Sequence, residues 1–202
     1  MKQLYLDKAF EITDNILSET TMSEPGGLPY LLLGSVPSQH SVWIKLGRNF
    51  EEWFKVVAED CGMELLPDGV IKNVIGSKSK DIDFIFEYKL NKIIYYYEDK
   101  SNLELDTEKL PATYNKVKAI HKYLEETYPG YTIKSSILHW SIWNKDKLPK
   151  KYNTKIKECI KNGVSVSWPE DLFKILNAKI TEKDYNNMFR EMGIKLLKGN
   201  NE

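Results

Sequence analysis

The chain has 202 residues, of which 42% are hydrophobic and 29% are charged, and its formal net charge is +0. This length fits one domain, and the apolar fraction is large enough for a buried core. A neutral balance excludes a nonspecific DNA-coating protein, which would be strongly basic, so any DNA contact must come from local groups of lysines.

The composition also bears on cellular context. Cys61 and Cys159 match no zinc-binding spacing and no disulfide framework, which favours small core residues in a reducing cytoplasm. The N-terminal sequence MKQLYLDKAF lacks the apolar segment of a signal peptide, and no apolar run approaches the length of a membrane span. We therefore expect a soluble cytoplasmic protein with no membrane partner.

Two amphipathic helices are predicted in the first part of the chain. In residues 4–20, apolar residues recur at helical spacing. A second helix follows Ser41 and ends at Gly62, as helices commonly end at a glycine. Its apolar stripe consists of Phe50, Trp53, Phe54, Val57 and Cys61.

The middle of the chain predicts strands. Residues 82–86 and 93–97 are short runs rich in β-branched and aromatic residues, and the polar link 87–92 makes an antiparallel hairpin the simplest connection. Pro111 permits a helix start, and residues 131–144 predict a long, central strand. This order indicates an α/β fold with a mixed central β-sheet flanked by helices.

Two further helices are predicted toward the C-terminus. Ser167 with Glu170, and Thr181 with Asp184, have the spacing of a capping box at a helix start. This helical pair could cover the sheet or form a dimer contact.

Acidic side chains interrupt the two predicted strands of the hairpin. Asp83 lies in the first strand, and Glu98, Asp99 and Lys100 end the second. Such charges are costly beside buried β-structure unless they are paired or bound to a metal. Because strand side chains alternate between faces, Glu98 and Lys100 point one way and Asp99 the other. Asp83 on the same face would bring two carboxylates and one ammonium together, although Asp81 has the same strand parity and remains a rival.

This set of side chains suits a divalent metal. Two carboxylates can hold a hard cation such as Mg²⁺, for which Mn²⁺ can substitute, with water and phosphate oxygens completing its shell. The metal would lower the pKa of a bound water, and Lys100 could orient or deprotonate that water and stabilise the phosphate.

Asp83 followed by Glu98-x-Lys100 resembles the PD-(D/E)XK nuclease superfamily. The continuation SNLELDTEK, residues 101–109, is similar to a run found in some type II restriction endonucleases. Upstream, the segment from Ser38 to Glu51 is similar to the first helix of that family, and it makes Glu51 a candidate auxiliary carboxylate. The pattern departs in one respect, since Ile82 precedes Asp83 where the family often has proline.

The resemblance implies a single nuclease domain over residues 1–202, with a restriction-endonuclease-like catalytic core at about 38–145 and a C-terminal helical part at about 167–198. It implies Mg²⁺-dependent, sequence-specific cleavage of double-stranded DNA that leaves 5′-phosphate ends. Asp83, Glu98 and the Asp99 carbonyl would hold the metal, and Glu51 would assist. A homodimer and a cognate DNA methyltransferase in the same system are also implied.

Candidate DNA contacts are lysines and polar residues near this site and in the basic stretch 144–161. They are Gln39, Lys45, Asn102, Lys109, Lys116, Lys145, Lys150, Lys151, Tyr152 and Asn153. The histidines at 40, 121 and 139 are scattered, and the chain has no glycine-rich phosphate loop, so neither histidine-based catalysis nor a nucleotide cofactor is expected.

Three alternatives stay open at this point. The acidic residues could be solvated charges at strand ends. The same superfamily also includes structure-specific resolvases and DNA-repair nucleases, which would favour junctions or ends over a sequence. The same scaffold could also serve as a non-catalytic module that binds DNA or protein.

Overall fold

The structure is a computed structural model that describes residues 1–20, 22, 37–67, 69–71, 80–101, 109–150 and 153–198, without the side chains of residues 39, 40, 69–71 and 198. The chain divides into two compact units. The first joins Met1–Val56 to Lys179–Glu202, and the second is Val57–Ala178. The prediction of one nuclease domain over the whole chain stays a prediction.

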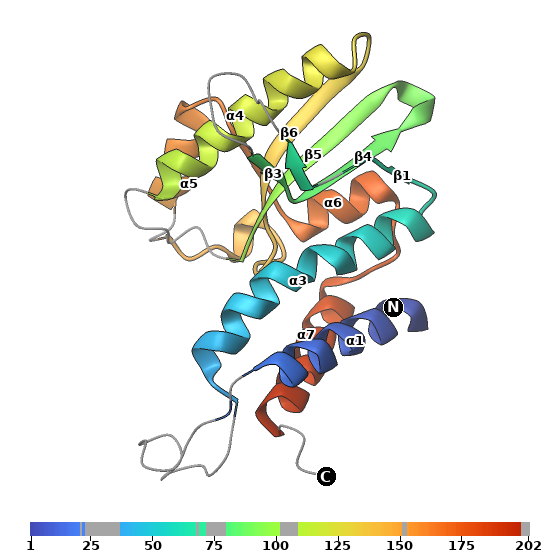
Figure 1. The fold of residues 1–202 in the computed structure, drawn as a ribbon, viewed down its shortest axis with the longest axis vertical. Coiled ribbons are helices and arrows are strands. Elements are labelled where there is room, and N and C mark those ends of the chain that lie inside the picture. Colours follow the sequence, from blue (N-terminus) through green and yellow to red (C-terminus); the bar gives the residue numbers. More distant parts are fainter. Residues whose placement is uncertain are drawn as a thin grey trace. The chain divides into compact units, whose positions relative to one another are not determined.

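The first unit is helical. It contains α1 (Gln3–Glu19), most of α3 (Gln39–Asp60) and α7 (Glu182–Lys198), which confirms the helices predicted from periodicity (Figure 1). Aromatic rings form its core, with Trp53 stacked on Phe50 at 5.3 Å between centroids. Trp53 also donates a hydrogen bond from Nε1 to the carbonyl of Tyr5 at 2.8 Å, so this buried indole is satisfied.

The second unit is built on a five-stranded sheet with the order β1-β4-β5-β6-β7 (Figure 1). The strands are β1 (Glu64–Leu65), β4 (Phe84–Tyr88), β5 (Ile93–Lys100), β6 (Thr132–His139) and β7 (Ser165–Ser167). The β1, β4 and β5 strands are antiparallel, whereas β5, β6 and β7 are parallel. A separate two-stranded sheet pairs β2 (Gly69–Ile71) with β3 (Lys80–Ile82).

Helices accompany this sheet, and their bounds are α4 (Lys109–Thr127), α5 (Asn153–Lys161) and α6 (Pro169–Leu176), with short 3₁₀ turns at η1 (Lys89–Asn91) and η2 (Lys145–Lys147). The predicted mixed sheet flanked by helices is therefore confirmed, as is the β4–β5 hairpin. The predicted strand over 131–144 is shorter, because β6 ends at His139. It pairs on both sides, but β5 is the central strand.

Period-two alternation explains how the sheet packs. Ile85 on β4 and Ile94 and Tyr96 on β5 form one core with Val117 and Ile120 of α4, so α4 covers this face. The intervening residues face the other way and form an aromatic layer that consists of Phe84, Phe86, Tyr95 and Tyr97. Both faces of the sheet are thus apolar, so charged groups at the strand ends are costly unless they are paired or bound to a metal.

The capping predictions have different outcomes. At α7, Thr181 Oγ1 accepts from the Asp184 backbone N–H at 3.2 Å, and Asp184 Oδ2 accepts from the Thr181 N–H at 3.1 Å, which confirms that box. At α6 the prediction was one residue too early. Asp171 accepts from the Trp168 N–H at 3.2 Å, so Trp168 is the cap and Pro169 opens the helix.

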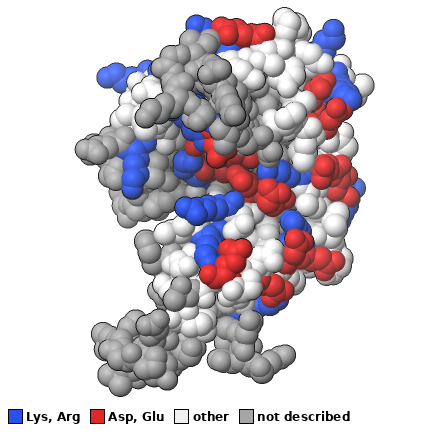
Figure 2. All heavy atoms as spheres, in the orientation of Figure 1, with Lys and Arg blue, Asp and Glu red and all other residues white. Residues whose placement is uncertain are grey.

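The surface carries charges of both signs. On the face drawn in Figure 2, basic and acidic side chains of the described residues are interspersed, in keeping with a net charge of +0. Within the described segments, none of the helices combines the length and the apolar character that crossing a membrane requires.

Candidate active site

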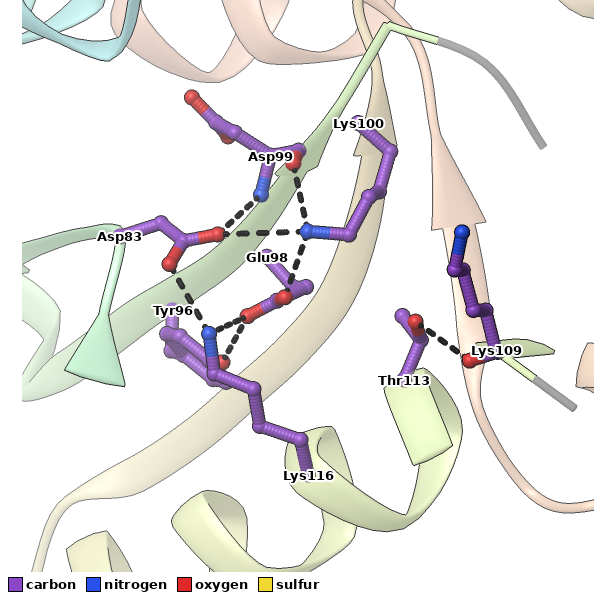
Figure 3. A network of polar contacts seen from close by, with 8 residues as sticks. All are labelled: Asp83, Tyr96, Glu98, Asp99, Lys100, Lys109, Thr113 and Lys116. Carbon is purple, nitrogen blue, oxygen red and sulfur yellow. Dashed lines mark hydrogen bonds and ion pairs between the residues drawn. The ribbon is translucent and has the colours of Figure 1, made fainter. Parts of the chain in front are cut away.

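Asp83 occupies the single position between β3 and β4, where the chain passes from the small sheet to the large one. The β4–β5 ladder pairs Phe84 with Tyr97, so the next antiparallel pair would set Asp83 opposite Glu98. Asp83 Oδ2 accepts a hydrogen bond from the Asp99 backbone N–H at 3.0 Å, which fixes this carboxylate against the end of β5 (Figure 3).

Glu98 lies at the same end of the sheet and is almost completely buried, with its side chain 3% exposed. Tyr96, two residues earlier on the same face, donates its hydroxyl to Glu98 Oε2 at 2.9 Å. Burial and the charge of Glu98 raise the pKa of Tyr96 well above its ordinary value, so this hydroxyl remains a donor. The glutamate is therefore held in a defined orientation by the strand that carries it.

Lys100 completes the group that the sequence predicted. Its ammonium lies 2.7 Å from Glu98 Oε1 and 3.7 Å from Asp83 Oδ2, and it donates to the Asp99 carbonyl at 2.9 Å. The three predicted residues thus converge at the carboxyl end of β5 (Figure 3). The Asp99 side chain points away from the group, as the strand alternation predicted.

Lys116, which comes from α4, is the member that sequence reasoning did not place here. Its ammonium lies 2.9 Å from Asp83 Oδ1 and 2.5 Å from Glu98 Oε2. In the structure, Thr113 and Ile120 are buried three residues before and four residues after Lys116, which places Lys116 on the side of α4 that faces the sheet. In the structure the Lys116 ammonium points toward the two carboxylates, and its predicted contact with DNA stays a prediction.

The electrostatics distinguish the two carboxylates. Burial, together with the negative charge of Glu98, raises the pKa of Asp83 against the opposing effect of the two lysines. Burial also acts to raise the pKa of Glu98, but the charges of Lys100 and Lys116 outweigh it and the pKa is lowered. For Lys116, the two carboxylates outweigh burial and raise the pKa. The fold therefore favours an ionised Glu98 and disfavours an ionised Asp83.

The oxygens of this site suit a hard cation. Asp83, Glu98 and the carbonyl of Asp99 offer oxygen donors only, as Mg²⁺ and Mn²⁺ prefer. In the part of the chain that the structure describes, no cluster of three or more acidic, histidine or cysteine side chains could hold a metal ion, so the third protein donor would be that carbonyl. Each of these donors currently accepts a contact from a lysine ammonium.

The end of β5 is anchored beyond the site. The Lys100 carbonyl accepts from the Trp140 N–H at 3.1 Å, and the hydroxyl of Ser141 donates to the Ser101 carbonyl. His139, next to Trp140, stacks on Trp168 at 5.4 Å between ring centroids. Burial lowers the pKa of His139 to about 4, so its ring is neutral at neutral pH and packs against Trp168.

The remaining predicted residues are distributed as follows. Asp81, the rival of Asp83, is exposed on β3. Glu51 is half-buried on α3 in the first unit, where the Lys45 ammonium also lies, near the carboxylate of Glu19 at 3.8 Å. Lys109 is exposed at the start of α4 and its carbonyl accepts from the Thr113 hydroxyl at 3.0 Å.

The predicted contacts in the basic stretch are only partly described. Lys145, Lys150 and Asn153 are exposed. Asn102, Lys151 and Tyr152 lie outside the described residues, as does the side chain of Gln39. Their predicted contacts with DNA stay predictions.

No known protein-family model matches the chain, and no curated protein matches it. Among solved structures, it is similar to the restriction endonuclease PspGI in complex with substrate DNA, with a TM-score of 0.39, 12% identity, and coverage of 95% of this chain and 92% of that one. It is also similar to an N-terminal domain of a reptarenavirus L protein, with a TM-score of 0.32, 13% identity, and coverage of 94% and 95%. Similarity at this level assigns the chain to no family.

Proposed function

We propose that the protein is a Mg²⁺-dependent endonuclease that hydrolyses phosphodiester bonds in double-stranded DNA. The observation that carries the proposal is the convergence of Asp83, Glu98 and Lys100, whose ammonium lies 3.7 Å from the first carboxylate and 2.7 Å from the second. An acidic pair beside a lysine at the carboxyl end of a strand is the arrangement that the Asp…Glu-x-Lys pattern predicted.

The proposed chemistry assigns a role to each group. Asp83, Glu98 and the carbonyl of Asp99 would hold the metal, which when bound neutralises charge on a phosphoryl oxygen and lowers the pKa of a water. Lys100 uses two of its ammonium protons on Glu98 and Asp99, at 2.7 and 2.9 Å, which leaves a third donor for the attacking water or a phosphoryl oxygen. Attack of water on phosphorus would break the P–O3′ bond and leave a 5′-phosphate and a 3′-hydroxyl.

The finer proposal is a type II restriction enzyme. A sequence-specific enzyme of this kind would act on a short palindrome as a homodimer, because a two-fold protein matches a two-fold DNA site. A methyltransferase in the same system would protect the host's own sites. Glu51 would assist in catalysis, and the exposed Lys145, Lys150 and Asn153 would contact DNA.

The test is digestion of a supercoiled plasmid of known sequence in Mg²⁺. We expect discrete fragments from the wild type and a loss of at least about 100-fold in rate for Lys100→Ala. Lys122→Ala is the matched control, because Lys122 is an exposed lysine of α4. Cleavage by Lys100→Ala near the wild-type rate would show that the assignment of Lys100 is wrong, whereas smears or junction-only cutting would favour a repair nuclease or resolvase.

A non-catalytic DNA-binding module is the second candidate. The observation that favours it is charge balance, because two ammonium groups already neutralise the two carboxylates in the described structure. Titration with Mg²⁺ by calorimetry separates the two functions. A nuclease should bind the metal, whereas a module held together by these ion pairs should give no heat.

A further inference from the structure

The contacts of Lys116 go beyond what the proposed nuclease chemistry uses. Its ammonium lies between the two carboxylates, 2.9 Å from Asp83 Oδ1 and 2.5 Å from Glu98 Oε2, and its side chain is only 18% exposed. Lys100, by comparison, lies 3.7 Å from Asp83. Lys116 is therefore the cation that bridges the pair most closely (Figure 3).

We propose that Lys116 is a built-in substitute for the metal, which neutralises the carboxylates in the metal-free protein and must leave before a divalent cation can bind. The inference rests on the proposed function, since it assumes that Asp83 and Glu98 are metal ligands. It makes Lys116 a positioning residue that sets how tightly the metal is held.

A positive charge is needed between the carboxylates of Asp83 and Glu98 on electrostatic grounds. Asp83 and Glu98 face each other at a strand end where both are largely buried, and two like charges in a site of low polarity repel strongly. An ammonium between them removes this repulsion while no metal is bound. A divalent cation bound through Asp83 Oδ1 and Glu98 Oε2, the two oxygens that Lys116 contacts, would repel an ammonium held at both of them, so the two exchange.

The structure of α4 around Lys116 allows its ammonium to exchange with a divalent cation. Its backbone is fixed, because its neighbour Val117 and Ile120 one turn on are buried in the core beneath the sheet. Its charge is carried on a flexible four-carbon stem that can move the ammonium aside without moving the helix. Lys100 contacts the other oxygen of Glu98, Oε1 at 2.7 Å, and lies 3.7 Å from Asp83, so it can stay in place while Lys116 leaves.

The test measures Mn²⁺ binding by calorimetry on the metal-stripped full chain, without DNA and without an activity assay. Lys116→Met keeps the length and packing of the stem but removes the ammonium, and we expect it to bind Mn²⁺ at least about tenfold more tightly than the wild type. Lys118→Met is the matched control, because that ammonium lies 5.6 Å from the ring centroid of Tyr114 on the same helix. It should bind Mn²⁺ like the wild type.

Thermal unfolding provides a second readout. Without metal, Lys116→Met should melt below the wild type, because the carboxylates lose a counter-charge, and Mn²⁺ should raise its Tm by more than it raises that of the wild type. If Lys116→Met fails to fold, Lys116→Gln keeps a neutral hydrogen-bond donor and carries the same expectation.

The outcomes separate the two proposals. Wild-type binding of Mn²⁺ with equal or weaker binding by both Lys116 variants would overturn the role of Lys116 and leave the nuclease proposal intact. Absence of Mn²⁺ binding by the wild type and by both variants would overturn the metal site itself, and the inference with it.

Discussion

The unequal electrostatics of the two carboxylates lead to a sharp prediction about stability. Because the fold lowers the pKa of Glu98 and raises that of Asp83, removing the first charge should cost far more than removing the second. The matched variants are Glu98→Gln and Asp83→Asn, which keep the shape of each side chain and neutralise it.

The expected loss of unfolding free energy for Glu98→Gln follows from the contacts of the Glu98 carboxylate. Glu98 is 3% exposed and accepts from Lys100 at 2.7 Å, and its other oxygen lies 2.5 Å from Lys116. Breaking a buried ion pair by removing one partner costs about 3–5 kcal/mol, and we expect about 3 kcal/mol for Glu98→Gln because the amide can still accept a hydrogen bond. For a chain of this size, that loss lowers the Tm by roughly 6–12 °C.

Asp83→Asn should behave differently. Its amide oxygen can still accept from the Asp99 N–H, now at 3.0 Å, and neutralisation removes both the desolvation of a charge and the repulsion from Glu98. We expect a change of less than about 1 kcal/mol, or a gain in stability, as is common where a functional site is strained for activity.

The assay is urea unfolding at pH 7 in EDTA, followed by far-UV circular dichroism, with thermal melts in parallel. A loss of stability for Asp83→Asn equal to or greater than that for Glu98→Gln would contradict this prediction. In that case the two carboxylates are equivalent members of a structural ion-pair network, and their difference carries no functional meaning.

Three smaller predictions concern other groups of the second unit. Tyr96→Phe removes a donor to Glu98 and should cost about 1.5 kcal/mol of stability and about tenfold in cleavage rate; an unchanged rate would exclude a positioning role for that hydroxyl. His139 has a folded pKa of about 4 against 6.5, so its contribution to stability is complete above pH 6.5 and about 3 kcal/mol is lost as the pH falls to 4. His139→Phe should remove that part of the acid slope in urea titrations, and an unchanged slope would contradict the assignment. Burial raises the pKa of Cys159 to about 11, so iodoacetamide at pH 8 should label Cys61 and spare Cys159 in the native protein, as peptide mass spectrometry would show.

Local patterns in the sequence were sufficient to predict much of the candidate site. The period of two in β5 places Tyr96, Glu98 and Lys100 on one face, and the short polar link 87–92 makes β4 its antiparallel partner. These two facts together bring Asp83 to Glu98, so the convergence depends on hairpin register rather than on distant contacts.

Other features depended on tertiary packing and could not be predicted locally. The rotation of α4 about its axis decides whether Lys116 faces solvent or the sheet. Leu110 and Thr113 are buried together with Val117, and this burial sets the rotation of α4 that turns Lys116 toward the sheet. The choice between Asp81 and Asp83 depended on where the chain passes from β3 to β4, and no spacing rule marks that position.

The most direct measurement of the central claim is anomalous diffraction from crystals of the protein soaked in Mn²⁺. We predict an anomalous peak between the carboxylates of Asp83 and Glu98, with the Lys116 ammonium displaced from its position 2.9 Å from Asp83 Oδ1 and 2.5 Å from Glu98 Oε2. Anomalous density elsewhere, with both lysines still seated on the two carboxylates, would contradict it.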